Sequence, residues 1–111
     1  MDDLTNDQKF LLTSMYKHFL ELQPGLSPEE ANIFIDSNYV QKNFAPQFSK
    51  EYVSDLCWKL EAKEYISCSR GDNLAKNIVL EDKTIIYMEN SFKRNVKSIA
   101  SFLKNVIGIV K

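Results

Sequence analysis

The chain has few of the residues that interrupt or crosslink a folded protein. Its 111 residues include three glycines, three prolines and two cysteines. So few Gly and Pro argue against a disordered or linker-rich chain, and this length supports one domain, residues 1–111, rather than two. We recognise no secretion signal, so we expect Cys57 and Cys68 to be reduced, partly buried thiols, with a disulfide as the alternative.

The sequence also lacks a long apolar run and an excess of one charge. No stretch approaches the roughly 18 apolar residues that a membrane-spanning helix needs. With no signal peptide recognised either, we expect a cytoplasmic protein with no membrane contact. The formal net charge is −1, so a nucleic-acid-binding protein of this composition must gather its positive charge on one face.

Motifs typical of catalysis are missing. There is no Gly-rich phosphate loop, no H-E-x-x-H and no G-x-S-x-G. The single histidine, His18, adjoins a helical apolar stripe, which favours a structural role. With one histidine, Cys57 and Cys68 would need carboxylates or another chain to complete a zinc site. We therefore expect no enzyme activity, no cofactor and no metal.

Two helices are predicted in the first third of the chain. Thr5 or Asn6 can cap a helix from about residue 7 to 22, which residues 23–25 end. Ser27-Pro28-Glu29-Glu30 is a strong helix start, because serine caps, proline suits the first position and glutamates suit the positive end of the helix dipole. The second helix is short, and its expected buried residues are Ile33, Phe34 and Ile35.

Residues 36–48 are ambiguous. Residues 36–38 are typical of a turn, and the apolar residues that follow could anchor another helical turn: Tyr39, Val40 and Phe44. Ser49 then opens a third clear helix, expected to end near Lys63. Its inward face is predicted from the i, i+3, i+4, i+7 spacing of Val53, Leu56, Cys57 and Leu60.

The pattern changes after residue 64. Residues 65–69 and 77–80 are rich in β-formers and flank the turn residues 70–73, which predicts a β-hairpin. A long helix over 82–111 follows, and Asn90-Ser91 is expected to break or bend it, because both residues are indifferent helix formers. This order predicts an α+β, mostly α fold: a winged helix-turn-helix of three helices and a two-stranded wing, with a long C-terminal helix.

Two segments resemble a known family. Residues 49–66 (SKEYVSDLCWKLEAKEYI) resemble a recognition helix and first wing strand, and residues 78–102 resemble a second wing strand and terminal helix. The pattern L-x-D-x-x-I-I-Y-M-E-N-x-F-K, at 80–93, is similar to small winged-helix proteins of Gram-positive bacteria, including the YjcQ-like family, which often lie in prophages and other mobile elements. The resemblance implies this fold but no site residues, and residues 36–48 fit it poorly.

A small regulator of a phage or mobile element follows from this resemblance. If it regulates transcription by binding double-stranded DNA, the third helix enters the major groove and the wing contacts the backbone. The predicted DNA contacts are Lys50, Ser54, Lys59, Arg70 and Lys76. Acidic side chains on the same helix oppose phosphate: Glu51, Asp55 and Glu61.

The alternative is an interaction module of the same fold that binds a repressor or host protein. Its expected contacts are Trp58 and Asp55, because an exposed Trp is a common anchor at protein interfaces. Trp58 could instead pack beneath the C-terminal helix or the 36–48 segment.

The last helix carries an apolar seam and a basic stripe. The seam predicts a homodimer, or else packing on Leu12, Tyr16 and Phe19 of the first helix. Its residues are Phe92, Val96, Ile99, Leu103, Val106 and Val110. The stripe predicts a solvated face, a phosphate-contacting surface, or a membrane-surface helix inserting Phe102, Ile107 and Ile109. Its residues are Lys93, Arg94, Lys97 and Lys104.

Overall fold

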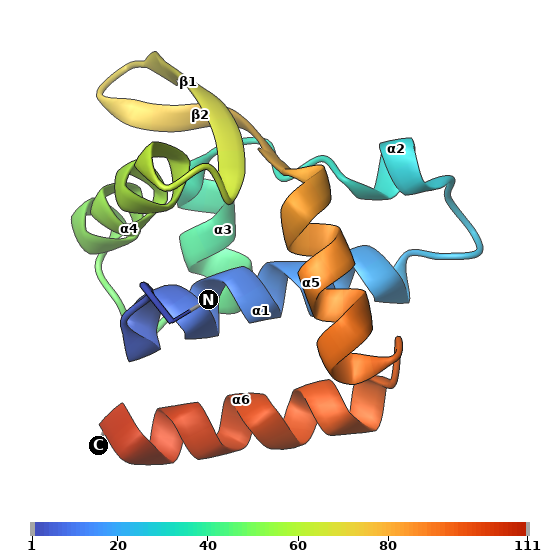
Figure 1. Cartoon of the computed structure of the whole chain (residues 1–111). Helices are drawn as coiled ribbons and strands as arrows, with labels where there is room; N and C mark the ends of the chain where they lie inside the picture. The colour runs from blue at the N-terminus through green and yellow to red at the C-terminus, as the bar shows by residue number, and fades with distance from the viewer. Residues whose placement is uncertain (1, 111) are drawn as a thin grey trace.

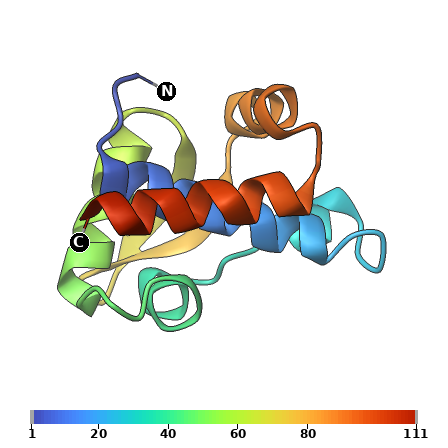
Figure 2. The ribbon, with the colours of Figure 1, turned by 90° about the horizontal axis from the view of Figure 1, so that it is seen from below.

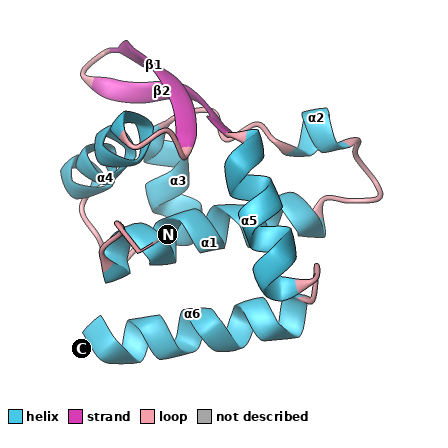
Figure 3. Ribbon diagram, in the orientation of Figure 1, coloured by secondary structure: helices cyan, strands magenta, loops and turns pink. Residues whose placement is uncertain are grey.

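A computed structural model describes the backbone of residues 2–110 and the side chains of residues 2–106. Within these residues the protein is an α+β fold, mostly helical, with six helices and one two-stranded antiparallel sheet (Figures 1 and 3). The elements are α1 (Asn6–Glu21), α2 (Pro28–Ala31), α3 (Ser37–Phe44), α4 (Lys50–Ala62), β1 (Ile66–Gly71), β2 (Leu74–Leu80), α5 (Asp82–Phe92) and α6 (Val96–Val110).

The central helix α1 separates two sides of the molecule. The hairpin β1–β2 lies on one side, together with α3 and α4, and α6 runs antiparallel along the other side (Figures 1 and 2). The core is built around α1, whose Leu11, Leu12, Met15 and Tyr16 are completely buried. No helix within the described residues is long and apolar enough to cross a membrane.

Side-chain caps fix the first two helix starts as predicted. Thr5 accepts a hydrogen bond from the Gln8 backbone, and Ser27 accepts one from Glu30, each in a reciprocal capping box. The second helix is shorter than expected and ends at Ala31. The predicted burial of Ile33 and Ile35 is therefore wrong: they are 58% and 54% exposed, whereas Phe34 between them is fully buried.

This alternation arises because residues 33–36 are not helical and run beside β2, with Ile35 at a φ of 60°. The Phe34 N–H donates to the Ile78 carbonyl at 3.1 Å, and the Asn77 N–H donates to the Ile35 carbonyl. An isolated antiparallel bridge joins Asp36 to Lys76. Outside a helix, neighbouring side chains here face different ways: Phe34 lies in the core, and Ile33 and Ile35 on either side of it are exposed.

The ambiguous 36–48 segment contains a helix. The Asp36 carboxylate accepts a hydrogen bond from the Tyr39 N–H at 2.8 Å and caps α3. The turn predicted at 36–38 is therefore wrong, while the anchoring role of Val40 is confirmed by its complete burial.

The third predicted helix and the hairpin are confirmed. Ser49 caps α4, whose predicted inward face is buried: Val53, Leu56, Cys57 and Leu60. The hairpin turn is Asp72-Asn73, with φ values of 54° and 63°, as a two-residue turn of the primed type requires. The pairing register shifts between Ser67 and Ser69. There Asn77, also at positive φ, forms a bulge that aims its N–H at residue 35.

The long helix predicted over 82–111 is divided into two, and the division falls at residues 93–95 rather than at the break or bend expected at Asn90-Ser91. The chain forms α5 and α6, joined by Lys93-Arg94-Asn95, and Lys93 and Arg94 both take the left-handed conformation. A helix ends where the chain turns left-handed. The Asn95 carboxamide then accepts from the Ser98 N–H and starts α6 in a new direction.

Candidate functional site

The outward side of α4, together with residues 70–76 of the hairpin, forms what we call the α4–hairpin face. Three of the predicted DNA contacts are exposed on it: Lys50, Lys59 and Arg70. Ser54 is not, because it is only 9% exposed and its hydroxyl has no hydrogen-bond partner within the described residues. Its predicted place on the outward face is therefore wrong. Ser54 lies next to Val53 in the sequence, at the edge of the buried inward face of α4.

Both cations of the hairpin already have a partner within the chain. Lys76 forms an ion pair with Asp72 at 2.6 Å across the turn, and its hydrogen bond lowers the pKa of Asp72 below the ordinary value. The Arg70 guanidinium lies 4.1 Å from the centre of the Trp58 ring. Exposed pairs such as Lys76–Asp72 contribute little to stability, but they reduce the positive charge offered to a ligand.

Trp58 lies beside the hairpin. Its side chain is half-buried and packs against the core, while Arg70 covers one face of the ring. A surface hollow of about 420 Å³ is lined by Trp58, Arg70, Gly71, Asp72, Asn73 and Leu74. The structure thus leaves part of an aromatic side chain accessible next to an exposed cation.

The α4–hairpin face has no net charge. Residues 50–80 include five basic side chains, Lys50, Lys59, Lys63, Arg70 and Lys76. They include equally many acidic ones, Glu51, Asp55, Glu61, Glu64 and Asp72. Glu51 and Asp55 are exposed on the outward side of α4, where a groove-binding helix would meet phosphate.

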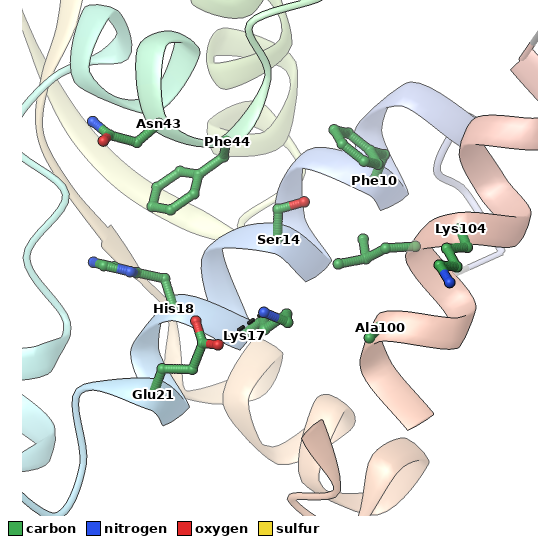
Figure 4. A pocket seen from close by; sticks show the side chains of 10 residues that line it. Phe10, Ser14, Lys17, His18, Glu21, Asn43, Phe44, Ala100 and Lys104 are labelled. Atoms are coloured by element: carbon green, nitrogen blue, oxygen red, sulfur yellow. Dashed lines mark hydrogen bonds and ion pairs between the residues drawn. The ribbon is translucent and has the colours of Figure 1, made fainter. Parts of the chain in front are cut away.

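A second surface, which we call the α1–α3–α6 groove, lies on another part of the molecule (Figure 4). Its volume is about 510 Å³. Its lining residues are Phe10, Ser14, Lys17, His18, Glu21, Asn43, Phe44, Ala100, Leu103 and Lys104. His18 contacts the rings of Phe44 and Phe34, with centroids 5.0 and 6.1 Å away. Sequence reasoning missed this groove because three separate helices build it.

The apolar seam is used within the chain. Ile99 is fully buried and Val106 is 4% exposed, and α6 packs on α1. The expectation that these two residues are free for a second copy is therefore wrong. Phe92 packs edge-on against Phe102 at 5.6 Å, Leu103 is half-buried in the groove wall, and Val96 is 38% exposed.

Three predicted residues cannot be placed. The side chain of Val110, predicted in the seam, lies outside the residues whose side chains are described, as do those of Ile107 and Ile109, predicted to insert into a membrane.

The last part of the chain contains basic residues but no acidic ones. All fifteen acidic residues precede position 90, and five basic residues follow it: Lys93, Arg94, Lys97, Lys104 and Lys111. Arg94 pairs with Glu89 at 2.7 Å. Lys93, Lys97 and Lys104 are exposed and form no ion pair among the described side chains. Among the residues that the structure describes, no group of three or more His, Cys, Asp or Glu side chains is placed to hold a metal ion.

Neither a scan against protein-family models nor searches of curated proteins and of solved structures find a match for this chain. Its function is therefore proposed from the chemistry of the two surfaces.

Proposed function

We propose that this protein is a winged-helix interaction module that binds another protein through the α4–hairpin face. The observation that carries the proposal is the accessible Trp58, stacked with Arg70 on a face without net charge. Tryptophan and arginine are the residue types most enriched among the energetic anchors of protein interfaces.

The order and pairing of elements support the winged-helix assignment. After α1 and the short α2 come α3 and α4, then β1 and β2. Residues 34–36 lie along the outer edge of the hairpin and bond to residues 76–78. With α1, α3 and α4 as the three helices, this order is the one expected of a winged helix. The short α2 is an addition, so the second of those helices is α3 and not the 28–35 segment.

The charge distribution favours a protein partner over duplex DNA. Binding to duplex DNA depends mainly on neutralising phosphates with lysine and arginine. Here Glu51 and Asp55 project from α4, and Lys76 is paired with Asp72. A mixed-charge face around an aromatic anchor instead resembles the partly polar surfaces of non-obligate protein interfaces.

A site-specific photocrosslinker tests this proposal. Placed at the exposed Ala62, one turn beyond Trp58 on α4, it should label one protein in cells, and the same group at exposed Asn90 on α5 should not. Trp58→Ala should abolish the labelling. Since Trp58 also packs on the core, Arg70→Glu provides a second variant at an exposed position. Equal labelling from positions 62 and 90, or labelling unchanged by both substitutions, contradicts the proposal.

Duplex DNA is the second candidate partner. The helix order and the exposed Lys50 and Lys59 on α4 favour it. In that case the protein is a transcriptional regulator of a phage or mobile element, as the resemblance to the YjcQ-like family predicts. Fluorescence anisotropy with a duplex of about 30 base pairs at low salt separates the two. Binding that falls steeply with salt and is lost in Lys50→Glu and Lys59→Glu supports DNA and overturns the protein proposal.

A further inference from the structure

We propose that the α1–α3–α6 groove binds an acidic amphipathic helix of a partner protein. The groove is separate from the α4–hairpin face, because α6 and the hairpin lie on opposite sides of α1 (Figures 1 and 2). The inference therefore does not depend on the function proposed for that face.

The groove offers apolar surface from all three helices. Phe10 comes from α1, Phe44 from α3 and Leu103 from α6 (Figure 4). Phe10 packs edge-on against Phe48 with ring centroids 6.2 Å apart, and Phe44 packs against His18 at 5.0 Å with the rings tilted by 56°. Phe44 and Leu103 are only half-buried, so part of their surface is available to a ligand. A volume of about 510 Å³ is within the range of formed ligand sites.

The charged side chains of the groove leave one positive charge, that of Lys104, uncompensated at its edge. Lys17 is paired with Glu21 at 2.8 Å, so these two charges compensate each other. Lys104, on the opposite wall, is exposed and has no ion pair within the described residues. No Asp or Glu follows Glu89 in the sequence, so α6 carries no carboxylate of its own to neutralise it. A carboxylate on the ligand would form an ion pair with Lys104.

The dimensions of the groove suit a helix. Its α1 wall extends from Phe10 to Glu21, and a helix rises about 16 Å over that interval. Two apolar anchors one turn apart on a bound helix are separated by about 5 Å. The groove thus accommodates two such anchors between the aromatic side chains and Leu103, with acidic residues of the same helix facing Lys104.

Two synthetic peptides test the proposal by fluorescence anisotropy with the full-length protein. Both place leucines at i, i+3, i+4 and i+7, and the remaining positions are mainly glutamate in one peptide and lysine in the other. We expect the acidic peptide to bind at least about tenfold more tightly than the basic one. Lys104→Glu should weaken the acidic peptide about tenfold or more. Lys97→Glu, which makes the same charge change on α6 outside the groove lining, should have a much smaller effect.

Each result decides for or against the proposal. Equal affinity for the two peptides, no binding of either, or equal effects of Lys104→Glu and Lys97→Glu would overturn it. Displacement of the peptide by laurate at a similar concentration would assign the groove to a small amphipathic carboxylate instead. Self-association that blocks the peptide would assign it to a second copy. Trp58→Ala, on the other face, should leave peptide binding unchanged, so failure here is distinct from failure of the proposed function.

Discussion

The substitution Ile99→Ala distinguishes a seam used within the chain from one that joins two copies. Ile99 is on α6 and is fully buried. If it packs within its own chain, its truncation lowers the free energy of unfolding of a monomer. If it instead joined two chains, stability would depend on protein concentration.

The expected magnitude follows from burial. Ile→Ala removes three carbon groups, each contributing about 0.8 kcal/mol when buried, and the resulting cavity adds to this loss. Fully buried Ile→Ala changes cost about 2–5 kcal/mol, and we expect about 3 kcal/mol here. The matched control is Val96→Ala at the start of the same helix. Val96 is 38% exposed, and Ala is the better helix former, so we expect a loss below about 1 kcal/mol.

Urea unfolding followed by circular dichroism measures both variants. With a slope near 1.5 kcal/mol/M, a loss of about 3 kcal/mol lowers the midpoint by about 2 M. Midpoints of all three proteins should be independent of concentration. For a homodimer, a tenfold dilution would shift the equilibrium by about 1.4 kcal/mol. Such a shift, together with its loss in Ile99→Ala, would refute the intramolecular seam.

Two further predictions concern contacts between distant parts of the chain. The Asn32 carboxamide donates to the Leu80 carbonyl at 2.9 Å and accepts from the Leu80 N–H at 2.7 Å. Asn32→Ala should therefore cost about 2–4 kcal/mol in urea unfolding, and an equal loss in exposed Asn90→Ala would contradict this role. Burial and the hydrogen bond to Asp3 raise the pKa of Tyr65 from 10.0 to about 12. Because the folded pKa is the higher one, this stabilisation is complete below pH 10 and is lost as the pH rises toward 12. The fall in melting temperature over that range should be smaller in Tyr65→Phe, and an identical fall would refute the assignment.

The parts of the fold that are encoded locally could be predicted from the sequence. Thr5, Ser27 and Ser49 cap helices in the structure as their positions indicated. A serine or threonine cap acts within three residues, so its signal is contained in the sequence around it. The hairpin could also be predicted from the sequence, because turn residues between two β-rich segments leave few other local conformations.

Residues 33–44 show where local signals were insufficient. Asp36 is both a turn residue and a helix cap, and short-range chemistry does not choose between them. The choice is made by the pairing of residues 33–36 with β2, some forty positions later in the chain. That pairing keeps residues 33–35 out of a helix, with Ile33 and Ile35 exposed, and leaves Asp36 at the start of α3.

The break between α5 and α6 was hidden for a different reason. Phe92 and Val96 are spaced as neighbours on one helix face, so the apolar period continues across the junction. Lys93 and Arg94 are good helix formers, yet both are left-handed. The reversal lets Ile99 and Val106 reach α1. Their burial offsets the cost of two residues in an unfavourable conformation, a balance that propensity does not register.

Packing, rather than spacing in the sequence, also determines which predicted site residues are exposed and free of partners within the chain. The sequence analysis assigned both Ser54 and Lys59 to the outward face of α4, but the structure buries the first and exposes the second. The sequence also predicts Arg70 and Lys76 as two cations of the wing that contact DNA. In the structure Arg70 stacks on Trp58, and Lys76 forms an ion pair with Asp72. What remains on the α4–hairpin face is an aromatic anchor among balanced charges, with Lys50 and Lys59 as exposed cations that form no ion pair among the described side chains. A partner that binds through phosphates and a partner that binds an aromatic anchor would therefore compete for this one face. Lys50→Glu and Lys59→Glu would weaken the first, and Trp58→Ala would weaken the second.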